Sequence, residues 1–97
     1  MKAARVTGPK HIEIEDVQIP DLETGQCLVR LENWSVCGSD IRKYYGPLFP
    51  EEDYPMRIGD PCHECSGTIV ESRSNKFKEG QRVIVLPGSG ETGGLVE

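Results

Sequence analysis

The stretch that decides the fold lies at residues 27–33 and reads CLVRLEN. Val29 and Leu31 alternate there with the charged residues Arg30 and Glu32. A period of two is typical of a β-strand that buries one face. The same alternation predicts a half-buried strand at 12–17, and β-branched runs predict three further strands at 2–6, 67–71 and 81–86.

Turn-forming residues separate these five runs. The chain has eleven glycines and seven prolines, and they form turn signals at 8–9, 19–21, 24–25, 46–47 and 78–80. One short helical turn is predicted at 40–45, with Ser39 as its N-cap and Gly46 as its C-terminal stop. Residues 46–61 are predicted to form a loop. The expected fold class is all-β, a barrel or sandwich with one or two short helical turns.

Length and charge exclude several classes of protein. A chain of 97 residues is one small domain or a piece of a larger one. It has no apolar run near the ~18 residues of a membrane span, and its start lacks the apolar stretch of a secretory signal, so we expect a cytoplasmic protein. The net charge of -5 repels phosphate backbones and acidic membranes. We therefore expect no nucleic-acid or membrane partner.

The cysteines point to thiol or metal chemistry. Four cysteines, at 27, 37, 62 and 65, are too few for a disulfide scaffold, and no export signal precedes them. One of the two histidines, His63, stands between two of these cysteines. Metal binding is therefore the leading question.

The tetrapeptide from Cys37 to Asp40 follows a predicted strand and opens the predicted helical turn. A strand end places side chains at a rim, where a thiolate can bind a borderline metal and a carboxylate can orient another ligand. A buried cysteine followed by a Ser/Asp helix cap explains the same residues without a metal. The tetrapeptide alone leaves both interpretations open.

The hexapeptide CHECSG at 62–67 has three competing interpretations. A dithiol redox pair needs a helix after the first cysteine, but glycine and β-branched residues follow. A zinc knuckle needs a second ligand pair and would have to recruit Cys37. The third interpretation, a His-Glu pair that supplies one metal ligand and an acidic neighbour, makes neither demand.

Three motifs occur in a familiar order: VCGSD at 36–40, HExxG at 63–67 and FKEGQRV at 77–83. In this order the chain resembles the N-terminal, GroES-like catalytic domain of the zinc-dependent medium-chain alcohol dehydrogenases. The opening MKAA and the turn at 20–25 fit the same pattern. The resemblance implies an all-β, GroES-like partial barrel over residues 1–97. It also implies that the chain is the N-terminal portion of a longer protein whose cofactor domain follows.

The resemblance assigns roles to five residues. It implies that Cys37 and His63 are catalytic zinc ligands, and that Glu64 lies next to the metal and can enter its coordination shell. It implies that Asp40 is the partner of His63 on the side away from the metal. Ser39 is then the hydroxyl of the proton relay.

Some positions depart from the family pattern. Arg42 stands where the family has the last histidine of its proton relay, and it is expected to face the cofactor's phosphates instead. Cys62 and Gln81 replace a common glycine and a common aspartate. The string GSGETG at 88–93 imitates a dinucleotide-binding turn, but only four residues follow it, so we expect no cofactor site there. Four aromatic residues lie near the predicted site, and two roles are open for them: lining a substrate cleft or packing in the core. They are Trp34, Tyr44, Tyr45 and Phe49.

The expected function is that of a zinc-dependent oxidoreductase. It transfers hydride between a small alcohol or carbonyl compound and NAD or NADP, as a homo-oligomer of the full-length protein, and these 97 residues alone are expected to be inactive. The alternative is a small stand-alone zinc-binding or interaction module with a closed set of ligands, Cys37, Cys62, His63 and Cys65. A third possibility is a degenerate relative that keeps the barrel only as a scaffold.

Overall fold

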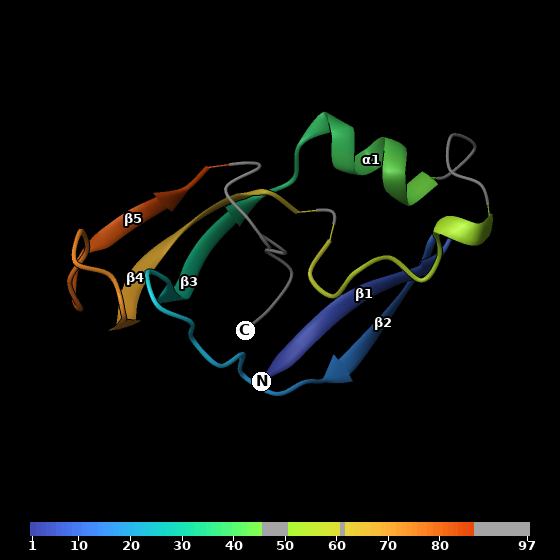
Figure 1. Ribbon diagram of the computed structural model, residues 1–97. Coiled ribbons are helices and arrows are strands. Elements are labelled where there is room, and N and C mark those ends of the chain that lie inside the picture. Colours follow the sequence, from blue (N-terminus) through green and yellow to red (C-terminus); the bar gives the residue numbers. More distant parts are fainter. Residues whose placement is uncertain (46–50, 61, 87–97) are drawn as a thin grey trace.

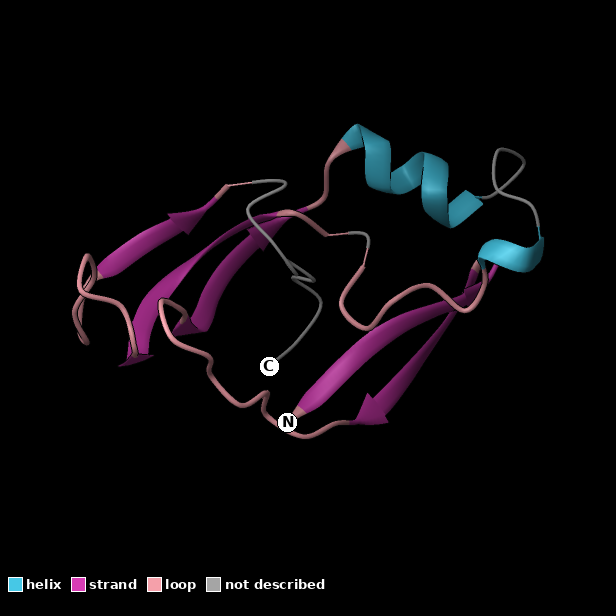
Figure 2. Ribbon diagram, in the orientation of Figure 1, coloured by secondary structure: helices cyan, strands magenta, loops and turns pink. Residues whose placement is uncertain are grey.

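A computed structural model describes residues 1–45, 51–60 and 62–86 as two antiparallel sheets and a short helix (Figure 1). Strands β1 (Lys2–Gly8) and β2 (His11–Asp16) form the smaller sheet. The larger sheet contains β3 (Cys27–Ser35), β4 (Glu64–Ser72) and β5 (Arg82–Val85), with β4 in the middle. The helix α1 (Gly38–Tyr45) follows β3, and η1 (Glu51–Asp53) is a single helical turn (Figure 2). The all-β class and all five predicted strands are confirmed, with small shifts at their ends.

The alternation predicted for the two half-buried strands holds for one of them. In β3, Val29 and Leu31 are half-buried while Arg30 and Glu32 are exposed. In β2 the expectation is wrong, because Ile14 is 68% exposed. The β1 and β2 pair is a two-stranded ribbon, and the described residues do not cover the face that carries this isoleucine.

Strand β4 begins earlier than predicted, at Glu64, because its partner β3 continues to Ser35 and keeps pairing with it. Gly67 lies opposite Leu31 in this ladder. A Cβ atom on Gly67 would overlap the backbone carbonyl of Arg30. The glycine of the HExxG motif is therefore required by the close approach of β3 and β4.

The small core takes buried side chains from both sheets and from the segment that leads into β4. Its buried apolar side chains are Ala3, Val6, Leu22, Met56, Cys62, Cys65 and Ile69. Met56 donates its backbone N–H to the Val6 carbonyl at 2.9 Å, and Arg5 Nε donates to the Met56 carbonyl at 2.7 Å. These bonds fix residues 56–59 along β1, and Cys62 then lies two residues before the start of β4.

Helix α1 begins at Gly38, so Ser39 lies in its first turn and Cys37 occupies the N-cap position. The prediction that Ser39 is the N-cap is wrong. Asp40 causes the difference, since its Oδ2 atom accepts the backbone N–H of Cys37 at 2.9 Å. A carboxylate three residues beyond the N-cap stabilises the helix start in this way.

The predicted loop at 46–61 contains η1, and its residues 46–50 and 61 lie outside the described residues. The glycine string at 88–93 lies outside them as well. In the described part of the chain, no helix has the length and apolar character needed to cross a membrane.

Candidate metal centre

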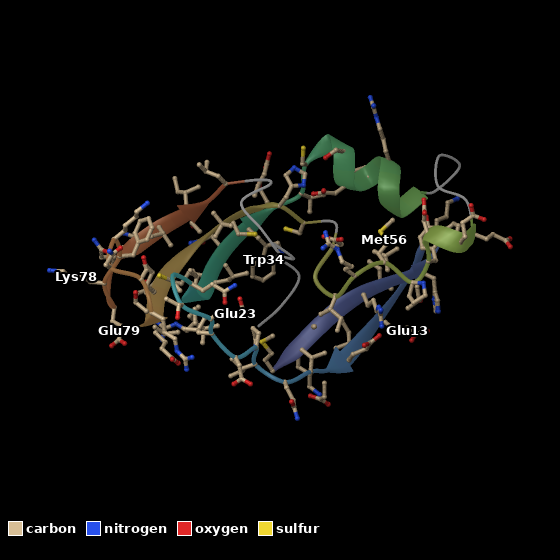
Figure 3. The ribbon with its side chains drawn as sticks, in the orientation of Figure 1. Glu13, Glu23, Trp34, Met56, Lys78 and Glu79 are labelled. Atoms are coloured by element: carbon tan, nitrogen blue, oxygen red, sulfur yellow. The ribbon has the colours of Figure 1, made fainter. Side chains whose placement is uncertain are left out.

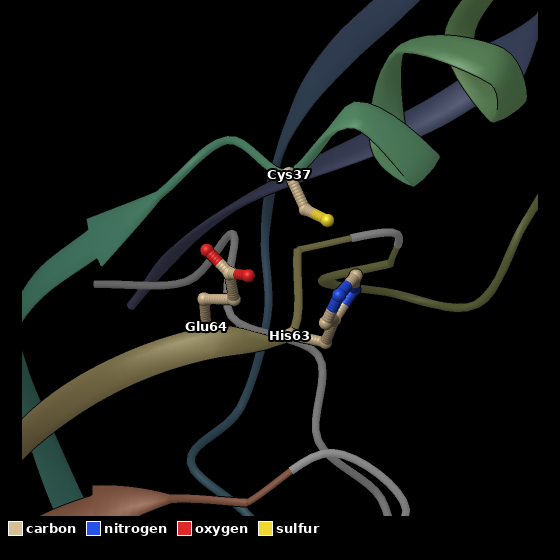
Figure 4. A group of neighbouring side chains, drawn as sticks. All are labelled: Cys37, His63 and Glu64. Atoms are coloured by element: carbon tan, nitrogen blue, oxygen red, sulfur yellow. The ribbon is translucent and has the colours of Figure 1, made fainter.

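Three potential metal ligands converge where β3 ends and β4 begins. One donor atom each from Cys37, His63 and Glu64 lies within 4.8 Å of the others. Figure 4 shows the three side chains pointing toward one another, Cys37 from the start of α1 and the other two from the start of β4. Antiparallel pairing explains the meeting, because the end of β3 lies beside the beginning of β4.

Asp40 links the two segments that carry these ligands. It is 5% exposed, and its Oδ2 atom holds the backbone of Cys37. Its other oxygen, Oδ1, lies 3.1 Å from Nδ1 of His63. This buried oxygen makes no hydrogen bond among the described residues. Its contact with His63 is therefore an ion-pair contact by distance alone. The Nδ1 side of the imidazole therefore faces a carboxylate.

The surroundings of Cys37 favour its thiolate form. Hydrogen bonds from the hydroxyl and the backbone N–H of Ser39 lower the pKa of Cys37, and a hydrogen bond with His63 adds to this effect. Partial burial and the negative charge of Glu64 oppose it, yet the net shift is downward. A thiolate is the form of cysteine that binds metals.

Glu64 is held by a residue that the sequence analysis did not single out. The Ser35 hydroxyl donates a hydrogen bond to Oε2 of Glu64. The two residues are direct partners in the β3 and β4 ladder. This contact was missed from the sequence because the strand predicted at 27–33 ended before Ser35, and the strand predicted at 67–71 began after Glu64.

Cys62 and Cys65 stay apart from the converging ligands. Their sulfur atoms lie 4.0 Å from each other, and both residues are buried. Burial raises the pKa of Cys65 to about 11, with the neighbouring Cys62 adding to the shift. Neither cysteine belongs to the set of donor atoms that meet at Cys37. The closed four-ligand set of the stand-alone module is thus not assembled among the described residues.

Two of the converging residues, His63 and Glu64, line a groove with a volume of about 450 Å³. Its walls include His63, Glu64 and Trp34, together with Ile84 from β5. Trp34 is 54% exposed, so it presents apolar surface to the groove instead of packing in the core (Figure 3). Arg42 is exposed on α1, outside the converging set. The side chains of Tyr44 and Tyr45, and all of Phe49, lie outside the described residues.

The donor set fits zinc. Thiolate sulfur, imidazole nitrogen and carboxylate oxygen are the three ligand types that zinc takes in proteins, and three protein ligands leave a fourth position open. The carboxylate that faces the outer nitrogen of His63 is the usual accompaniment of a zinc-bound histidine.

Comparison with known proteins decides the family. Residues 23–94 match the alcohol dehydrogenase GroES-like domain. The chain belongs to this family. The GroES-like fold class and the resemblance drawn from the three motifs are thereby confirmed.

Two relatives of this GroES-like chain are named as dehydrogenases. It is 35% identical to the (R,R)-butanediol dehydrogenase of Bacillus subtilis, covering 90% of this chain and 28% of that protein. It is 36% identical to the sorbitol dehydrogenase of the same organism, covering 91% of this chain and 25% of that protein.

A solved structure from Escherichia coli, described as an oxidoreductase/dehydrogenase of unknown specificity, superimposes with a TM-score of 0.69 at 36% identity. The match covers 87% of this chain and 25% of that one. The chain thus spans about a quarter of the length of the relatives it matches.

Proposed function

We propose that the chain is the metal-binding part of a zinc-dependent dehydrogenase, which transfers hydride between an alcohol or polyol and NAD or NADP. The observation that carries the proposal is the convergence of Cys37, His63 and Glu64 at one end of the larger sheet. The dehydrogenase relatives support it. In this proposal the cofactor is bound mainly by sequence that corresponds to the other three quarters of those relatives.

Cys37, His63 and Glu64 would hold the zinc ion, each through one donor atom. A zinc ion bound there acts as a Lewis acid that polarises the oxygen of an alcohol or a carbonyl compound. The groove beside Trp34 would receive the carbon chain of the substrate, since an exposed indole is a large apolar surface.

Asp40 would set the orientation and the tautomer of His63. Its Oδ1 atom faces Nδ1, so the negative charge of the carboxylate favours the ring proton on Nδ1. The lone pair of Nε2 then stays available for the metal. Because the same carboxylate holds the backbone of Cys37, one buried side chain orients both ligands.

Ser39 would move the proton. Its hydroxyl lies against Cys37, which places it at the edge of the metal centre. Turned toward a bound alcohol, the Oγ atom can accept the substrate proton while passing its own to water. Arg42 cannot continue the relay, because a guanidinium does not give up a proton near neutral pH. Its exposed position on α1 suits the phosphates of a dinucleotide instead.

Zinc stoichiometry tests the proposal. We expect Cys37→Ser and His63→Ala to lose zinc, because each removes one of the converging ligands. The double variant Cys62→Ser/Cys65→Ser should keep zinc, since both thiols lie outside the set. Loss of zinc in the double variant together with retention in His63→Ala would contradict the proposal and favour a knuckle.

A further inference from the structure

The residue that sets the position of Glu64 is Ser35, the last residue of β3. It stands directly opposite Glu64, the first residue of β4, in the antiparallel ladder. Direct partners have Cβ atoms about 4.5 to 5.5 Å apart and share one face of the sheet. A serine hydroxyl can reach a neighbouring carboxylate across that distance, and the Ser35 hydroxyl does donate to Oε2 of Glu64.

This hydrogen bond restricts a side chain that would otherwise be mobile. Glu64 is exposed, and an exposed glutamate has several rotamers of similar energy. Ser35 is short and is fixed by the strand that carries it. With Oε2 held by Ser35, the carboxylate stays at the end of the sheet that faces Cys37 and His63. Its Oε1 atom keeps its full acceptor capacity.

We propose that Ser35 is a positioning residue that presents the Glu64 carboxylate as an oxygen ligand of the metal centre. The inference rests on the zinc site proposed above and adds a residue outside its three motifs. Ser35 itself does not coordinate the metal. Because the Ser35 hydrogen bond already restricts Glu64 before the metal binds, Glu64 loses less side-chain entropy when it coordinates the metal.

The chain contains a matched control for this contact. On the same two strands, the Thr68 hydroxyl donates to Oε1 of Glu32 at 2.8 Å. This pair is also a hydroxyl and a carboxylate joined across β3 and β4, but neither residue belongs to the converging ligands. Removing the Thr68 hydroxyl therefore tests what a lost cross-strand hydrogen bond does to the sheet alone.

The experiment measures zinc affinity of the full chain by competition with a chromophoric chelator. Ser35→Ala should weaken zinc binding about 10-fold, the lower end of the 10- to 100-fold effect of residues that orient metal ligands, because water can partly replace an exposed hydroxyl. Ser35→Thr keeps a hydroxyl on a residue suited to strands and should restore the affinity. Thr68→Val should leave it unchanged. In a Glu64→Gln background, Ser35→Ala should have no further effect, because the residue it positions no longer binds.

Cobalt substitution gives a second measurement that a general loss of stability would not change. The visible spectrum of Co²⁺ reports its coordination number, and Ser35→Ala should shift it in the same direction as Glu64→Gln. Equal affinity of Ser35→Ala and the parent chain would overturn the inference. So would an equal loss in the parent and Glu64→Gln backgrounds, since Ser35 would then act through the strand.

Failure of the inference and failure of the zinc site give different results. If Glu64→Gln keeps full zinc affinity while Cys37→Ser and His63→Ala abolish it, the role of Ser35 is refuted and the zinc site stands. If Cys37→Ser and His63→Ala both keep zinc, the zinc site itself is refuted, and the role of Ser35 falls with it.

Discussion

Replacing Asp40 by asparagine separates the two tasks of this buried side chain. An amide oxygen can still accept the backbone N–H of Cys37, which Asp40 Oδ2 accepts at 2.9 Å. The amide NH₂ group must then face Nδ1 of His63, which lies 3.1 Å from Oδ1. An NH₂ group is a donor, so it favours the tautomer with a bare Nδ1 and a proton on Nε2. That proton occupies the position where zinc would bind.

The expected magnitudes differ between folding and metal binding. The amide introduced by Asp40→Asn keeps a neutral hydrogen bond at the helix start in place of a charge-assisted one, a difference of about 1 kcal/mol in the free energy of unfolding. Zinc affinity should fall by the 10- to 100-fold typical of residues that orient a metal-bound histidine, which is about 1.4 to 2.7 kcal/mol. Asp40→Ala, which removes both contacts, should lose more stability than Asp40→Asn.

Two measurements test this reasoning on the same samples. Thermal unfolding followed by circular dichroism gives the effect of Asp40→Asn on the metal-free chain, and chelator competition gives its effect on zinc affinity. Zinc affinity within about twofold of the parent chain would refute the argument that Asp40 selects the tautomer of His63.

Three further changes have defined outcomes. Ser39→Ala should keep zinc but lower turnover of the full-length protein by roughly 10²- to 10⁴-fold in steady-state assays. Unchanged turnover at full zinc occupancy would show that the Ser39 hydroxyl serves only its hydrogen bond with Cys37. Gly67→Ala should destabilise the chain by about 3 kcal/mol in urea unfolding, because its Cβ would overlap the Arg30 backbone; this is the upper end of overpacking effects. A loss of stability below about 0.5 kcal/mol would contradict the close approach of β3 and β4. At pH 8, iodoacetamide should modify Cys37 far faster than Cys65 in peptide mapping, because the pKa of Cys37 is lowered while that of Cys65 is raised to about 11. About one thousandth of Cys65 is then thiolate at this pH. Similar modification rates would contradict the difference between the surroundings of the two thiols.

The sequence predicts the strands because alternation and turns are local signals. Val29 and Leu31 alternate with charged residues, and this face of β3 is half-buried as expected. The same signal fails for Ile14, whose burial depends on what covers a two-stranded ribbon and not on its own strand. Period-two alternation thus identifies a strand without showing which face is covered.

The candidate site was predictable only in part, for a related reason. Cys37, His63 and Glu64 lie in recognisable motifs, and the structure brings their donor atoms together. Ser35 lies in no motif, and its contact with Glu64 depends on the register between β3 and β4. Register depends on long-range pairing, and the predicted strands stopped short of both Ser35 and Glu64, so this pair was missed.

X-ray absorption at the zinc edge of the loaded chain tests the central claim most directly, because it counts the sulfur atoms bound to zinc. A site made by Cys37, His63 and Glu64 predicts one sulfur at about 2.3 Å, with nitrogen and oxygen neighbours at about 2.0 to 2.2 Å. The His63→Ala variant should lose the imidazole scattering. Three sulfur atoms around zinc in the parent chain would mean that Cys62 and Cys65 have joined Cys37, and this result would contradict the account.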